Sequence, residues 1–161
     1  MKKTGRVLFE TTLKGNSSRN AILEAKGIAT PIKITIAGTS TPKTNEWLAE
    51  QMMLNYASSA FMKTFLIMAD KNNVPVSGFE CDAIGDATLK NKVPEINCIN
   101  IYPKIYVSNT SSLEAAKKLI EASIKNNPAE KMFPALISYH PVLEIKAMAK
   151  EIQMKKREVF F

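Results

Sequence analysis

The feature that most constrains the fold is the run from Trp47 to about Lys71, which contains neither glycine nor proline. Its core-type residues recur at three- and four-residue spacing, the period of one face of an α-helix. They are Met52, Met53, Tyr56, Ala57, Ala60, Phe61, Thr64, Phe65 and Met68. Thr44 is the predicted N-cap, with acidic Glu46 in the first turn. The run predicts a long, mostly buried helix that other elements must cover.

Strand-forming patterns lie on both sides of this helix. Before it, residues 6–13 alternate with a period of two, and "NAILEA" and "PIKITIA" follow after turn-forming segments. We therefore expect three short antiparallel strands at the start of the chain. After the helix, Val76–Thr88 and Glu95–Val107 flank the polar turn "LKNK", which predicts a long β-hairpin.

A second, amphipathic helix is predicted from "NTSSLEAAKKLIEASIKNN". Ser111 and Glu114 have the spacing of a capping box, and the helix should stop near Pro128 because proline cannot continue it. A short helical turn is expected over 129–133. The β pattern then resumes in "PVLEIKAMA", and residues 147–161 fit either a strand extension or a terminal helix.

Composition limits the expected number of domains and bears on membrane and secreted classes of protein. A chain of 161 residues with 45% hydrophobic content is expected to form one domain over residues 1–161. Its longest apolar stretch, Phe61–Ala69, is shorter than the ~20 residues of a membrane span, and the amino terminus lacks the apolar run of a secretory signal. We therefore expect a cytoplasmic protein with no membrane partner.

Cofactors and nucleic acid are also not expected. Two cysteines and one histidine give no disulfide framework and too few soft ligands for a zinc site, so neither a metal nor a cofactor is predicted. The formal net charge is +7, but the lysines are spread along the chain, with one dense run at 155–157. This distribution favours a generic basic surface over a nucleic-acid site.

Two stretches carry a resemblance to a known family. They are "SSAFMKTFLIMADKNNVPVSGFECDAIGDATL" and "INIYPKIYVSNTSSLEAAKKLIEASIKNNPAEKMF". Together with the order of elements, they resemble the OsmC/Ohr family of bacterial hydroperoxide-resistance and osmotically inducible proteins, over roughly residues 38–133. The resemblance implies an α+β fold of the OsmC-like type, in which two long helices are enclosed by antiparallel β-sheets and two chains intertwine as a homodimer.

The same resemblance locates two positions where that family carries cysteines. Val74-Pro75-Val76 matches the strand start after the first helix, and counting back from it places Ala60 at the first cysteine. The second precedes a proline at the end of the second helix, where this chain has Asn127. Alanine and asparagine can neither attack a peroxide nor resolve a sulfenic acid. The resemblance therefore implies an OsmC-like protein without the family's thiol peroxidase chemistry.

Other pocket residues follow from the resemblance alone. The family uses an arginine from the amino-terminal strands, for which Arg19 is the nearest counterpart and Arg6 a rival, and a helix glutamate, here Glu46 or Glu50. A solvated surface charge is the alternative for each of them. The implied interface pocket would bind a small apolar or amphipathic molecule, bounded by Ala60, Tyr56, Asn127, Arg19 and Glu50.

The two cysteines that the chain does contain suggest an alternative. Cys81 and Cys98 lie on the two arms of the predicted hairpin. A turn at 89–90 or at 90–91 keeps them on one face, whereas a three-residue loop would put them on opposite faces. Buried structural cysteines are our leading interpretation. The alternative is a thiol-dependent organic hydroperoxide reductase that uses this relocated pair, and a stress-associated dimer with no pocket activity is a third hypothesis.

Overall fold

The computed structural model describes residues 9–15, 20–35, 46–91, 93–134 and 136–146. The chain divides into two compact units. One contains the residues up to Met53 and the hairpin segment 87–96, and the other contains residues 54–86 and those from Asn97 onward.

The amino-terminal unit contains a three-stranded antiparallel sheet. Its strands are β1 (Thr11–Gly15), β2 (Asn20–Ala25) and β3 (Ile32–Thr35), in the order β1-β2-β3. Gly27 adopts φ +83° in the connection after β2, a conformation that glycine accepts without strain. The prediction of three short strands is confirmed, although the first begins at Thr11 in the described residues and its predicted start at Arg6 lies outside them.

The long helix is also confirmed, as α1 (Ala49–Lys71). It begins two residues later than predicted because Trp47 pairs with Ile34 in a β-bridge and its backbone N–H donates to the carbonyl of Lys33. The predicted N-cap Thr44 lies outside the described residues. The helix ends before Asn73, which has φ 54°.

The predicted hairpin is formed by β4 (Val76–Lys90) and β5 (Val93–Val107), which are neighbours in the second sheet. Both strands are longer than predicted. The turn contains Asn91 with φ 54°, whereas residues 89 and 90 still belong to β4. The two turn positions considered from the sequence are therefore wrong.

Two short strands complete this sheet, β6 (Ile137–Tyr139) and β7 (Val142–Ile145). Each pairs with β5 in parallel, so the sheet is mixed and not purely antiparallel as the resemblance implied. The sequence predicted β7 but missed β6, which has only three residues.

The second helix is preceded by a 3₁₀ turn, η1 (Thr110–Ser112), and runs as α2 (Leu113–Asn126). The predicted capping box is wrong. Asn109 accepts the backbone N–H of Ser112 at 3.0 Å and the hydroxyl of Ser111 at 2.7 Å, because the 3₁₀ turn moves the capping position upstream. The helix ends where predicted, and the short helical turn is α3 (Pro128–Met132).

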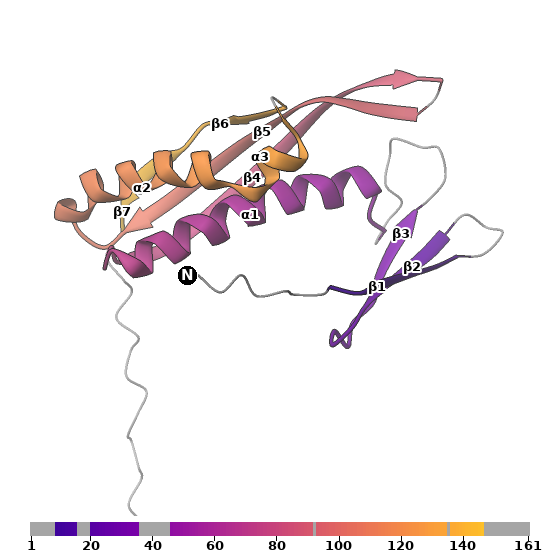
Figure 1. The fold of residues 1–161 in the computed structure, drawn as a ribbon, viewed down its shortest axis with the longest axis horizontal. Coiled ribbons are helices and arrows are strands. Elements are labelled where there is room, and N and C mark those ends of the chain that lie inside the picture. Colours follow the sequence, from indigo (N-terminus) through magenta and orange to yellow (C-terminus); the bar gives the residue numbers. More distant parts are fainter. Residues whose placement is uncertain (1–8, 16–19, 36–45, 92, 135, 147–161) are drawn as a thin grey trace, which may run out of the picture. The chain divides into compact units, whose positions relative to one another are not determined.

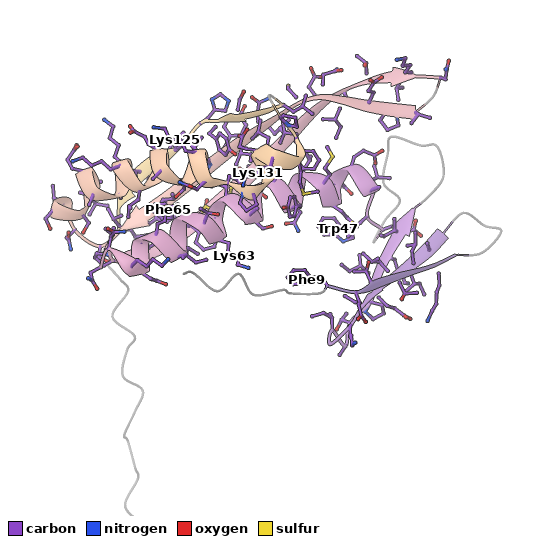
Figure 2. The ribbon with its side chains drawn as sticks, viewed as in Figure 1. Phe9, Trp47, Lys63, Phe65, Lys125 and Lys131 are labelled. Carbon is purple, nitrogen blue, oxygen red and sulfur yellow. The ribbon has the colours of Figure 1, made fainter. Side chains whose placement is uncertain are left out.

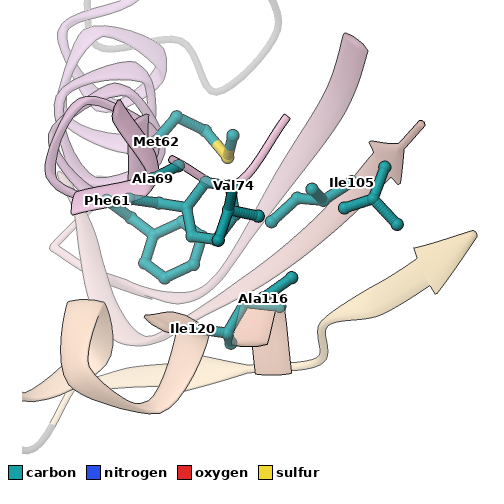
Figure 3. Close-up of a cluster of buried hydrophobic side chains, with 9 residues drawn as sticks. Phe61, Met62, Ala69, Val74, Ile105, Ala116 and Ile120 are labelled. Atoms are coloured by element: carbon teal, nitrogen blue, oxygen red, sulfur yellow. The ribbon is translucent and has the colours of Figure 1, made fainter. Parts of the chain in front are cut away.

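The core of the second unit lies between α1, α2 and one face of the mixed sheet, and both helices lie on that face (Figure 1). Figure 3 shows Phe61 and Met62 of α1, Ile105 of β5 and Ile120 of α2 in one cluster. The architecture is α+β, as predicted. None of the helices in the described ranges is both long and apolar enough to cross a bilayer.

Candidate functional site

The five residues expected to bound an interface pocket lie in different settings within the single chain. Tyr56 is 37% exposed, and its ring meets the ring of Phe133 edge-on, with centroids 6.3 Å apart. Ala60 lies one helical turn further along α1, is partly buried, and accepts a hydrogen bond from the Thr64 hydroxyl through its carbonyl. Glu50 lies in the first turn of α1, within the amino-terminal unit, and Arg19 lies outside the described residues.

The Asn127 side chain has a structural role, because it connects two elements of the fold. Its side chain is buried, at 1% exposure. The amide nitrogen donates to the Tyr139 hydroxyl at 2.7 Å, and the amide oxygen accepts the Ala129 N–H at 3.1 Å, which caps α3. Burial raises the pKa of Tyr139 above its usual range, so the hydroxyl remains protonated. Asn127 therefore joins the start of α3 to β6.

One cavity among the described residues of the second unit is an open groove of about 560 Å³ between α1 and β4. From α1 it is lined by one continuous stripe, and from β4 by three consecutive residues. The lining residues are Asn55, Ser58, Ser59, Met62, Lys63, Leu66, Ile67, Asp70, Phe79, Glu80 and Cys81. None of the five residues expected at the interface pocket is among them.

The groove has an amphipathic lining. Its middle is apolar, and Ile67 and Phe79 on its walls are 46% and 47% exposed. Of the small residues in the centre of α1, Ser58 and Ser59 face the groove, whereas Ala57 is fully buried. Both serine hydroxyls donate to backbone carbonyls of the preceding turn. Such a surface can hold a molecule that is mainly apolar and carries a polar group.

The groove contains one thiol, and its environment disfavours ionisation. Burial, with the nearby carboxylate of Asp82 as a smaller cause, raises the pKa of Cys81 to about 11. Nucleophilic attack on a peroxide requires the thiolate. Cys81 is therefore a poor nucleophile at neutral pH.

Cys98 lies on the other face of the sheet. It accepts a contact from the Asn100 amide at 3.6 Å, and it alternates along β5 with Ile99, which is fully buried. Cys81, in contrast, packs against the core cluster on the face covered by the helices. The expectation that the two cysteines share a face is therefore wrong. Both thiols are free.

No protein-family model matches the sequence, and no curated protein matches it. Solved structures do match the fold. An OsmC-like protein from Mycoplasma pneumoniae superposes with a TM-score of 0.67 at 14% identity, over 90% of this chain and 99% of that chain. The chain has the OsmC-like fold. An OsmC-like protein of unknown function from Vibrio cholerae gives a TM-score of 0.66 at 18% identity, over 88% of this chain and 100% of that chain.

An organic hydroperoxide resistance protein from Elizabethkingia anophelis has this fold too, with a TM-score of 0.66 at 12% identity, over 89% of this chain and 99% of that chain. The OsmC-like fold therefore carries proteins named for hydroperoxide resistance, whereas this chain has Ala60 and Asn127 where the resemblance places the cysteines. Within the described ranges, no group of three or more His, Cys, Asp or Glu side chains could hold a metal ion.

Sequence reasoning missed the groove, although a signal for it was present. Four polar residues of α1, namely Asn55, Ser59, Lys63 and Asp70, recur at helical spacing and fall on one stripe. A polar stripe on an otherwise apolar helix indicates a side that other elements of the same chain do not fully cover.

Proposed function

We propose that this OsmC-like protein is a non-peroxidatic relative of the hydroperoxide-resistance proteins, and that it binds a small apolar or amphipathic molecule in the groove between α1 and β4. The proposal departs from the pocket around Ala60 and Asn127, because those residues pack within the fold and do not line the groove.

The observation that carries the proposal is a groove large enough for a small ligand. Its thiol supports the non-peroxidatic part, because burial raises the pKa of Cys81 to about 11. At pH 7 such a thiol is ionised in about one molecule in 10⁴. Peroxide reduction needs a lowered thiol pKa, so this environment favours binding over thiol chemistry.

The lining supports an amphipathic ligand. Met62, Leu66 and Phe79 give apolar contact area, while Lys63 and Asp70 place charges at separate points along the stripe. Apolar walls with a few polar groups that fix orientation are typical of small-molecule sites.

Two measurements test the proposal. Consumption of an organic hydroperoxide with a dithiol reductant should be the same for the wild type and for the Cys81→Ser and Cys98→Ser variants. A loss of turnover in Cys81→Ser would refute the non-peroxidatic assignment.

Binding is tested with the fluorescent amphiphile 1-anilinonaphthalene-8-sulfonate. Ile67→Glu should weaken binding of this probe, because it places a carboxylate on the groove wall. The matched control is Ile145→Glu on β7, since Ile145 is 52% exposed and Ile67 is 46% exposed. Equal binding by the two variants would place the probe elsewhere and overturn the groove as the site.

A further inference from the structure

Two opposite charges lie on the groove side of α1, seven residues apart. Lys63 and Asp70 are both exposed and both line the groove, and Figure 2 shows Lys63 projecting from α1 away from α2. Seven residues are close to two helical turns, so the two side chains leave the same side of the helix about 10 Å apart along its axis. Within the described part of the chain, neither takes part in an ion pair. The groove therefore offers a cation and an anion at a defined spacing.

The position of each charge along α1 decides which ligand group it attracts. Asp70 lies in the last turn of the helix, where the helix dipole adds partial negative charge. Lys71, the next residue, does not line the groove. The end of the groove at Asp70 therefore attracts a cation, whereas Lys63, two turns earlier, attracts an anion.

Apolar walls lie between the two charges. On the α1 side the groove is lined there by Leu66 and Ile67, and Ile67 is 46% exposed. On the β4 side Phe79 is 47% exposed. Glu80 also lines the groove, but its carboxylate accepts the Tyr106 hydroxyl at 3.0 Å. A ligand that lies between the two charges therefore meets apolar surface from both elements.

We propose that the groove binds a short apolar peptide of about three residues with free ends, its carboxylate at Lys63 and its amino group at Asp70. The inference rests on the proposed function and names the class of ligand. An extended chain spans about 3.3–3.6 Å per residue, so three residues reach about 10 Å. Successive side chains of an extended peptide point in opposite directions, one set towards α1 and the other towards β4. An unbranched zwitterion has no side chains with which to contact both walls.

Isothermal titration calorimetry with trileucine tests the ligand class on the wild-type protein, at about 50 mM salt, where screening of exposed charges is weak. One peptide should bind per chain. Blocking either end, in the N-acetyl or the C-amide peptide, should weaken binding about three- to fivefold, the effect of one exposed ion pair. The unbranched zwitterion 8-aminooctanoic acid carries the same two charges without side chains and should bind more weakly than trileucine.

Removing one charge from the protein locates each end of the peptide. Asp70→Asn should weaken trileucine binding by a similar factor, and acetylation of the peptide should then cost nothing further, while amidation should keep its effect. In Lys63→Gln the two blocked peptides should exchange these behaviours. Such a cycle isolates the interaction between two particular groups. Glu114→Gln and Lys117→Gln at exposed positions of α2 are the matched controls and should bind trileucine like the wild type.

The inference is overturned if trileucine does not bind, if the blocked peptides bind as tightly as the free one, or if 8-aminooctanoic acid matches trileucine. An acetylation effect that persists in Asp70→Asn also overturns it. The fluorescent amphiphile separates these outcomes from failure of the proposed function. A groove that binds the amphiphile but not trileucine overturns only the peptide, whereas a groove that binds neither overturns both proposals.

Discussion

Replacing Asn127 should weaken the fold by an amount that can be worked from its two hydrogen bonds. Asn127→Ala removes the acceptor for the Ala129 N–H, and loss of an N-cap costs about 1 kcal/mol. It also removes the donor to the partly buried Tyr139 hydroxyl, which keeps its interaction with Glu130, and one lost hydrogen bond of this kind costs about 0.5–1.5 kcal/mol. The free energy of unfolding should therefore fall by about 1.5–2.5 kcal/mol.

Urea denaturation followed by far-UV circular dichroism, at matched protein concentration, measures this change. Asn127→Asp keeps a capping acceptor and should cost less than Asn127→Ala. Asn126→Ala is the control, because Asn126 is exposed and makes one local bond to the carbonyl of Ala122. A double-mutant cycle with Tyr139→Phe should give a coupling energy above about 0.5 kcal/mol. A loss below about 0.5 kcal/mol for Asn127→Ala would refute the capping argument, since it falls below the cost of a lost cap.

Other features of the structure give further predictions. Phe61 is fully buried against the Tyr139 ring, so Phe61→Ala should lower the free energy of unfolding by about 3–5 kcal/mol in the same urea assay. In Cys98→Ser protein, the rate of Cys81 alkylation by iodoacetamide should rise about tenfold per pH unit up to pH 11; a plateau near pH 8.5 would contradict the raised pKa. Because the folded protein holds this proton more tightly, its contribution to stability should be lost as pH rises from about 9 to about 11. Asn91 has φ 54°, so Asn91→Ala should cost about 1 kcal/mol by thermal melting, whereas Asn91→Gly should not destabilise.

The sequence was sufficient to predict the elements of the fold whose patterns were long. The helical period over α1 extends for more than six turns, and the second helix ends before Pro128 because proline cannot continue it. Both features were predicted correctly. Short elements, and elements that depend on their neighbours, were not predicted correctly. The three residues of β6 become a strand only because β5 supplies the pairing, and the late turn at Asn91 depends on how far the two long strands pair.

The candidate site was less predictable than the fold. The pocket that the resemblance placed at Ala60 and Asn127 stays a prediction, because a resemblance in pattern does not say which side chains a neighbouring element covers. Asn127 could have been identified as a cap, because an asparagine directly before a proline has the signature of a helix start. The groove depends on the spacing between α1 and β4, and no local sequence pattern specifies that spacing.

The buried Asn127 amide also limits which residues position 127 can accept. A mutation to cysteine at this position would deprive α3 of its cap and Tyr139 of its donor. Such a change would lower stability whatever chemistry the new thiol could offer, so the fold itself holds the asparagine in place.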